Sequence, residues 1–342
     1  MAVSRSVRLD IHGQYEEPVT LMDKLRQQYE LKKRDGQRSR YMMYVFWGLW
    51  TFQAPTQWYV ARHHLFPYLL HEFTDKTQHF VEVLYLFCIT EALLNLFCCS
   101  ICSSTYVKTR ATIEDHRSSE HGKSSPDQIL LQNGHLPDDG GLPWRYCDKC
   151  DMMIPPRAHH CKICNVCILK RDHHCFVLGK CIGHYNQRYF VVLTFYATIV
   201  GMGGVILTTS YLRLFYWPDA VWTDFLLPVT IYRGLFGTMQ SHIAIMIIHI
   251  YTETAIGILG IIFFPSQIVS IYKGVTLFEM MKGLSVLNTN SVNANFVSVF
   301  GNFWALNFIF PMTFICRQKD GTSWDGVKFN YNFKQRTRFS NS

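Results

Sequence analysis

The 342-residue sequence is poor in charged residues. Asp, Glu, Lys and Arg make up 17% of it, whereas hydrophobic residues make up 49% and aromatic residues 15%. That balance disfavours an ordinary soluble globular protein. Four stretches contain at most one charged residue each: 41–61, 83–107, 189–212 and 242–272. Because a helix needs about 20 mostly apolar residues to cross a bilayer, the sequence predicts four membrane-spanning helices.

Lys and Arg are also scarce in two of the five segments around these stretches. Segments 61–78 and 213–241 hold two each, whereas 1–40, 104–188 and 273–342 hold nine, twelve and eight. The positive-inside rule therefore places the last three in the cytosol. The net charge of +8 then reflects cytosolic segments near anionic lipid and gives no reason to expect nucleic acid. The polar first forty residues predict no cleavable signal peptide.

The remaining composition divides the chain further. Residues 114–141 are rich in Ser, Gly, Asp and His and predict a flexible linker. The apolar stretch 296–316 contains Asn302, Asn307 and Pro311, so we expect it to lie on or dip into the cytosolic face. The predicted parts are a cytosolic N-terminal segment (1–40), four spans (41–61, 83–107, 191–213, 242–272), a linker (108–143), a cysteine-rich domain (144–190), a luminal loop (214–241) at the opposite interface and a cytosolic C-terminal region (273–342).

Cysteine is concentrated in one place. Seven of the twelve cysteines lie between Cys147 and Cys181, with four histidines among them. Thiols stay reduced in the cytosol, so this cluster predicts metal binding rather than disulfides. A structural zinc site takes four Cys or His ligands, and short Cys-x2-Cys turns present two of them. Two ions need eight ligands, so three of the eleven Cys and His residues would be spare.

The spare residues raise the question of chemistry. Asp172-His173-His174-Cys175 supplies a carboxylate, a base and a thiol within four residues. A histidine activates a thiol by taking its proton, and a carboxylate orients that histidine. Spacing alone does not say which histidine binds metal and which serves the thiol. A purely structural zinc module remains the alternative.

The segment from Cys147 to Phe190 resembles the cysteine-rich domain of the DHHC protein S-acyltransferases, or palmitoyltransferases. The resemblance rests on RAHHC at 157–161, CILKRDHHC at 167–175 and the downstream Cys181, Asn186 and Phe190. It also covers four spans with this domain between the second and third. It implies that Cys175 is the nucleophile, His173 its base and Asp172 the orienting acid. It implies two structural zinc ions, with the ligand sets Cys147, Cys150, His160, Cys167 and Cys161, Cys164, His174, Cys181.

The resemblance further implies an activity. Cys175 would take a long-chain acyl group from acyl-CoA, such as palmitoyl-CoA, and pass it to membrane-proximal substrate proteins with cytosolic cysteines. The protein would reside in the Golgi or endoplasmic reticulum membrane. Nearby cations at Lys170, Arg171, Lys180 and Arg188 would attract the CoA phosphates, or simply reflect positive-inside charge. His159 lies outside both ligand sets and would serve packing or surface hydrogen bonding.

The sequence departs from the family pattern in two places. Phe176-Val177 and Gly179-Lys180 replace the usual Pro-Trp and paired asparagines, and the Thr-Thr-x-Glu motif reads Thr276-Leu277-Phe278-Glu279. A catalytically weak or silent scaffold is therefore the main alternative, and a channel or transporter leaves the cysteine cluster unexplained. Four ionisable residues lie in or near spans, where such groups are often functional: Glu82, Glu91, His249 and Glu253. We also consider acylation of Cys98, Cys99, Cys102 and Cys316, although buried thiols are usually inert.

Overall fold

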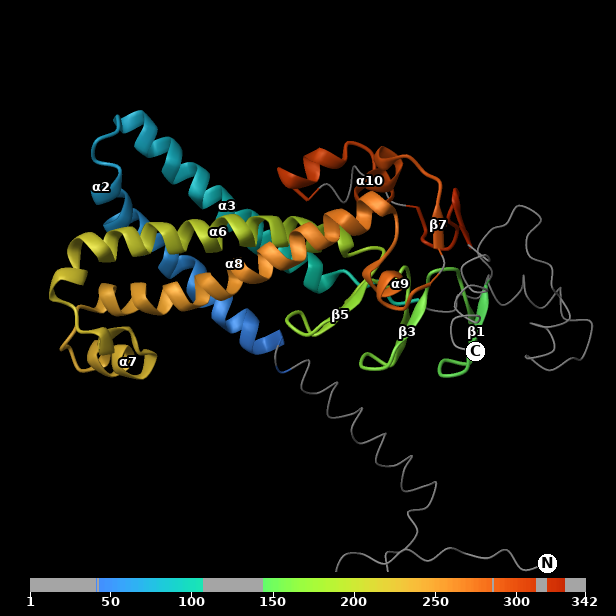
Figure 1. Ribbon diagram of the computed structural model, residues 1–342, viewed down its shortest axis with the longest axis horizontal. Coiled ribbons are helices and arrows are strands. Elements are labelled where there is room, and N and C mark those ends of the chain that lie inside the picture. The colour runs from blue at the N-terminus through green and yellow to red at the C-terminus, as the bar shows by residue number, and fades with distance from the viewer. Residues whose placement is uncertain (1–40, 42, 107–143, 285, 312–318, 330–342) are drawn as a thin grey trace, which may run out of the picture.

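A computed structural model describes residues 41, 43–106, 144–284, 286–311 and 319–329 of the chain. Long helices run side by side along the longest axis, and small β-hairpins gather at one end (Figure 1). The predicted linker 108–143, Cys316 and the whole N-terminal segment 1–40 lie outside the described residues.

The helical bundle contains the predicted spans. Residues 43–60 are helical and continue through η1 (Ala61–Leu65) and α2 (Phe66–Leu69). The longer helices are α3 (Asp75–Ile101), α6 (Gln187–Phe215) and α8 (Ser241–Lys273). These three are long and apolar enough to cross a membrane. The remaining predicted span, at 41–61, stays a prediction.

The ends of the long helices follow from local sequence. The Thr74 side chain accepts a hydrogen bond from the Thr77 backbone N–H and caps the start of α3. Thus α3 begins before residue 83, where the span is predicted to start, and it ends at Ile101. Helix α8 ends where Gly274 adopts a φ of +66°, a conformation that costs glycine little.

Glycine sets the distance between α6 and α8. A Cβ added to Gly201 would lie 2.5 Å from the backbone nitrogen of Gly257, and one on Gly260 would lie 2.4 Å from the Thr198 hydroxyl. Side chains at these positions would push the helices apart. Small residues of this kind allow membrane helices to pack through close backbone contact.

The polar residues in the predicted spans make contacts within and between the helices. Glu91 accepts a hydrogen bond from Asn95 at 3.0 Å, and His249 Nε2 lies 3.0 Å from the Thr56 hydroxyl. Glu253 is 2% exposed, and its carboxyl carbon lies only 2.6 Å from where a Cβ on Gly204 would be. Glu82, nearer the start of α3, pairs with Arg62 at 2.9 Å. These contacts favour a bundle-forming role over a separate site.

The end of the bundle far from the hairpins carries the loop 214–241. It forms η2 (Trp217–Asp219), η3 (Trp222–Phe225) and α7 (Leu227–Leu235). Buried Asp224 forms an ion pair with Arg233. Trp222, Leu235 and Phe236 are 74%, 78% and 67% exposed. Exposed aromatic and apolar groups here suit the membrane interface that the sequence predicts for this loop.

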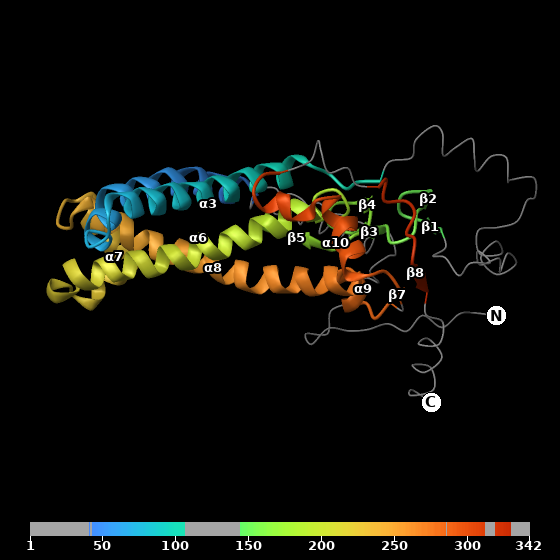
Figure 2. The same ribbon diagram turned by 90° about the horizontal axis from the view of Figure 1, so that it is seen from above.

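Helices α6 and α8 approach the hairpins, and the C-terminal region packs against them there (Figure 2). It consists of α9 (Leu277–Met281), β7 (Val286–Asn288), α10 (Val292–Phe300), η4 (Trp304–Phe308) and β8 (Val327–Phe329), with β7 antiparallel to β8. In the stretch 296–316, α10 ends at Phe300 and Gly301 separates it from η4. The described residues 296–311 therefore form no continuous span, and their association with the membrane surface stays a prediction.

Candidate active site and metal centres

Three β-hairpins repeat at a spacing of fourteen residues. They pair β1 (Arg145–Cys147) with β2 (Met152–Ile154), β3 (His159–Cys161) with β4 (Val166–Ile168), and β5 (His173–Cys175) with β6 (Lys180–Ile182). Each first strand ends at a cysteine: Cys147, Cys161 and Cys175. Each turn ends with a positive φ, at Asp151, Asn165 and Gly179. Asp, Asn and Gly are the residues that tolerate this conformation best, so the local sequence favours all three turns.

The hairpins are linked by shared ligand groups. Two cysteines of one hairpin lie close to a histidine and a cysteine of the next hairpin. This histidine and cysteine face each other across the two strands, as His160 and Cys167 do in the second hairpin and His174 and Cys181 do in the third. Two groups result, and within each group the ligand atoms all lie within 4.8 Å of one another. They are Cys147, Cys150, His160, Cys167 and Cys161, Cys164, His174, Cys181.

Both groups fit zinc. Tetrahedral zinc with sulfur bonds of about 2.3 Å places two sulfurs roughly 3.8 Å apart. The Sγ atoms of Cys164 and Cys181 lie 3.7 Å apart, and those of Cys150 and Cys167 lie 3.6 Å apart. The Nδ1 atom of His174 lies 3.2 Å from Cys164 Sγ and 3.6 Å from Cys181 Sγ. The expected ligand sets are thus brought together, and each would hold one ion that braces two hairpins.

The third hairpin has no hairpin after it to share ligands with. Cys175 occupies the position that Cys147 and Cys161 hold in the other two, but Leu178 stands where their second turn cysteine would be. Cys175 belongs to neither metal group and is 6% exposed. The structure therefore leaves this thiol available for chemistry.

Asp172 and His173 lie beside that thiol. His173 Nδ1 is 2.8 Å from Asp172 Oδ2, and since a carboxylate only accepts hydrogen bonds, Nδ1 donates. His173 Nε2 is buried and makes no hydrogen bond among the described residues, so it can accept a proton. Burial lowers the pKa of His173, but interactions with Asp172 and Cys175 outweigh this effect and raise that pKa to about 9. The imidazolium form is therefore well stabilised.

Asp172 is held by groups distant in sequence. Its Oδ2 atom accepts a second hydrogen bond, 2.6 Å long, from Gln267 Nε2 of α8. Its Oδ1 atom accepts one from the backbone N–H of Leu277 at 2.8 Å. The side chain is completely buried, so these donors replace the water that the charge has lost.

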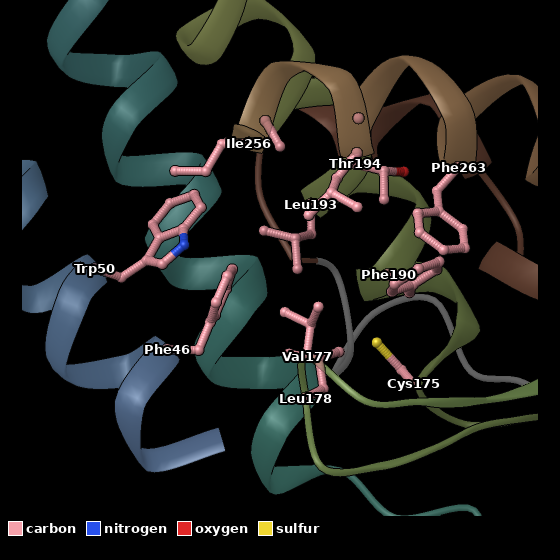
Figure 3. A pocket seen from close by; sticks show the side chains of 13 residues that line it. Phe46, Trp50, Cys175, Val177, Leu178, Phe190, Leu193, Thr194, Ile256 and Phe263 are labelled. Carbon is pink, nitrogen blue, oxygen red and sulfur yellow. The ribbon is translucent and has the colours of Figure 1, made fainter. Parts of the chain in front are cut away.

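Cys175 faces an apolar pocket between the helices. The pocket encloses about 470 Å³, including space that opens to solvent. The Cys175 sulfur points toward Phe190 and Phe263, while Trp50 lies at the opposite side (Figure 3). The lining comes from the helix at 43–60, α6, α8 and the third hairpin: Phe46, Trp50, Cys175, Val177, Leu178, Phe190, Leu193, Thr194, Ala197, Ile256, Leu259, Gly260 and Phe263. Such a lining suits an extended hydrocarbon chain.

A buried ion pair joins the hairpins to the C-terminal region. Arg157 donates from Nε and Nη2 to the two carboxyl oxygens of Glu279, at 2.8 and 2.7 Å. Glu279 also accepts from the Thr276 backbone N–H, and the Thr276 hydroxyl accepts from the Glu279 N–H. This capping box begins α9, and the first residue of α9, Leu277, is the backbone donor to Asp172. The ion pair thus supports the site from a distance.

The nearby cations are engaged within the protein. Lys180 Nζ donates to the carbonyls of Ser100 and Cys102, at 2.7 and 2.6 Å, and satisfies the end of α3. Arg171 donates to the His160 carbonyl, and Lys170 and Arg188 are 5% and 4% exposed. These contacts favour structural roles over attraction of CoA phosphates.

The remaining residues singled out in the sequence also have places. Asn186 accepts hydrogen bonds from the Gly183 N–H and the Ser104 hydroxyl, joining the hairpins to α6. Cys99 is fully buried. The His159 ring packs 4.3 Å from Phe278, and burial lowers its pKa to about 3. Sequence reasoning missed Gln267, whose only signal was an amide in an otherwise apolar span.

Comparisons with known proteins agree with this geometry. A family model described as DHHC palmitoyltransferase matches residues 142–284. Palmitoyltransferase ZDHHC22 of Danio rerio is 32% identical over 173 residues, which cover 49% of this chain and 56% of that protein. Palmitoyltransferase ZDHHC22 of Mus musculus is 29% identical over 189 residues, covering 54% of this chain and 70% of its own length. The chain thus spans little more than half of the first relative. Residues 142–284 of this chain thus match the DHHC palmitoyltransferase family.

Proposed function

We propose that this protein is a membrane S-acyltransferase that transfers a long-chain acyl group from acyl-CoA to cysteines of substrate proteins. One observation carries the proposal: a thiol outside both metal groups lies between a carboxylate-bound histidine and an apolar pocket. Burying a methylene gains about 0.8 kcal/mol, so a sixteen-carbon chain has a strong reason to enter such a pocket. Its thioester would then lie at Cys175.

The proposed reaction has two steps. His173 Nε2 takes the proton of Cys175, and the thiolate attacks the thioester carbonyl carbon. The carbon–sulfur bond to CoA breaks, and the CoA thiolate leaves with the proton from His173. In the second step His173 deprotonates a substrate cysteine, and that thiolate attacks the acyl carbonyl carbon. The bond to Cys175 sulfur breaks, and the Cys175 thiolate recovers the proton from His173. The eight Cys and His ligands would hold two zinc ions, which brace the hairpins and have no part in the chemistry.

The substrates are proposed to be proteins with cysteines near the cytosolic membrane surface, in the Golgi or endoplasmic reticulum. Cys175, at the end of β5, lies at the end of the bundle where the described parts of the Lys- and Arg-rich segments 104–188 and 273–342 are found (Figure 1). A cysteine held at that surface can reach the thioester without entering the bilayer.

A silent scaffold is the competing proposal, because the sequence departs from its family after Cys175. The departures are compatible with the site. Gly179 supplies the positive φ that ends the turn, and Lys180 caps α3. Leu277 contributes a backbone N–H to Asp172, which does not depend on its side chain. These contacts support the enzyme.

Labelled palmitoyl-CoA tests the proposal on the purified full chain. Wild type should acquire a hydroxylamine-sensitive label, and Cys175→Ser should acquire none while retaining two zinc ions per chain. Absence of label on folded, zinc-loaded wild type would refute the activity. Label that persists in Cys175→Ser would refute the nucleophile.

A further inference from the structure

Two glutamines in the long helices are linked to each other, and one of them, Gln267, contacts the candidate catalytic set. Gln187 and Gln267 are each at most 1% exposed. Gln267 Nε2 donates to Asp172 Oδ2 at 2.6 Å, and Gln267 Oε1 accepts from Gln187 Nε2 at 3.0 Å. The result is a chain of hydrogen bonds from α6 through α8 to Asp172 and His173. Buried amides in apolar helices are costly unless paired, so their placement needs a reason.

The hydrogen bonds fix the direction of the Gln267 amide. A carboxylate can only accept, so the NH₂ group must face Asp172. Gln187 Nε2 donates to the carbonyl oxygen of this Gln267 amide. A flip of the amide would turn its oxygen toward the Asp172 carboxylate and its NH₂ group toward the Gln187 donor, so the contact with Gln187 opposes the flip. Gln187 thereby holds Gln267 in the one orientation that serves Asp172.

The same two helices also hold the histidine ring. Phe263 lies four residues before Gln267 on α8, and its ring stacks on His173 at 5.7 Å with an interplanar angle of 14°. Phe190 lies three residues after Gln187 on α6, and its ring meets His173 edge-on at 5.0 Å. Residues three or four apart share a helix face. Each helix therefore supplies one amide toward the carboxylate and one aromatic ring against the imidazole.

We infer that Gln267, oriented by Gln187, is a positioning residue that fixes Asp172 and through it the His173 ring toward Cys175. The inference rests on the proposed acyltransfer, for which it assigns a role to span residues. Asp172 Oδ2 accepts hydrogen bonds from both His173 Nδ1 and Gln267 Nε2. Without Gln267 the carboxylate can rotate away from the geometry that aims Nε2 at the thiol. Neither glutamine lines the apolar pocket, so acyl-chain binding is independent of them.

The test separates the rate of chemistry from the amount of folded protein. Single-turnover acylation of the purified full chain by labelled palmitoyl-CoA gives a rate constant and an amplitude. Gln267→Met keeps the length of the side chain and removes the donor. Hydrogen bonds to charged groups are among the stronger ones, so its acylation rate constant should fall roughly ten- to hundred-fold. The amplitude, zinc content and KM for acyl-CoA should stay within about twofold of wild type.

Two further variants define the chain of contacts. Gln187→Met should slow acylation less, and the double variant should be no slower than Gln267→Met because Gln187 acts through Gln267. The matched control is Gln57→Met. Gln57 is another buried glutamine, and it donates a 2.8 Å hydrogen bond to the Tyr85 hydroxyl, which is not part of the candidate site. Its rate constant should equal that of wild type.

A rate constant for Gln267→Met within twofold of wild type, with only the amplitude reduced, would assign the residue a structural role and overturn the inference. So would an equal loss in Gln57→Met. If Gln267→Met fails to retain zinc, Gln187→Met decides, and an unchanged rate constant there overturns the inference. Absence of label in wild type instead refutes the proposed activity, so the two failures are distinguishable.

Discussion

The buried ion pair between Arg157 and Glu279 provides a test of how the hairpins are held to the C-terminal region. The two side chains are 3% and 2% exposed and share two hydrogen bonds. The guanidinium also donates to the Gly274 carbonyl and lies 4.9 Å from the Trp324 ring. Glu279→Gln preserves the shape of the side chain but leaves the guanidinium without its counter-charge. Breaking a buried pair in this way costs about 3–5 kcal/mol.

The free energy of unfolding in detergent, followed by Trp fluorescence and by zinc release, measures this cost. Lys319→Met is a matched control in the same region, because it breaks an ion pair with Asp325 whose partners are 73% and 80% exposed. Exposed pairs contribute at most about 1 kcal/mol, so this variant should remain close to wild type.

A double variant completes the test. Arg157→Met with Glu279→Gln removes both charges, and replacement of a whole buried pair is often nearly neutral. It should therefore recover most of the loss seen in Glu279→Gln. The reasoning is refuted if Glu279→Gln costs no more than Lys319→Met, or if the two single changes add in the double variant.

Three other predictions follow from packing, titration and metal binding. Gly201→Val should separate α6 from α8 and lower the thermal midpoint by several degrees in a melting scan, because its Cβ would strike the Gly257 backbone. Burial and the Arg157 charge lower the pKa of Lys170 to about 7, so from pH 7 to 10.5 the unfolded chain holds a proton that the folded chain lacks. Folding stability should therefore rise over that range. The free energy of unfolding of Lys170→Met should rise less with pH in parallel denaturant titrations. Cys164→Ser should reduce zinc from two ions to one per chain by metal analysis, since each group supplies four ligands; two retained ions would contradict this assignment.

Local pattern accounts for the elements themselves. The charge-poor stretches correspond to long helices, and the Asp, Asn and Gly residues at 151, 165 and 179 match three positive-φ turns. The cysteine spacing indicates metal, because two thiolates separated by two residues can meet one ion within a turn. None of this requires knowledge of which hairpin lies beside which.

Contacts between segments that are far apart in the sequence could not be predicted from local pattern. The sequence contains Arg157 and Glu279 in recognisable motifs, but nothing local indicates that they pair across 122 positions. Gln267 appeared only as part of a span, since its partner Asp172 lies 95 positions away. The cations at Lys170 and Lys180 looked available for phosphate until the structure showed one buried and the other bonded to the end of α3.

The sequence by itself determined a membrane-associated chain with a metal-binding cysteine cluster, because hydrophobic length and ligand spacing act over a few residues. Only the tertiary structure decided what surrounds the spare thiol. The eight candidate ligands form two groups of four between neighbouring hairpins. Cys175 belongs to neither group because its hairpin is the last of the three. Helices α6 and α8 then bring apolar walls, two aromatic rings and a buried amide to the same point. That convergence depends on packing between segments, which no local pattern encodes.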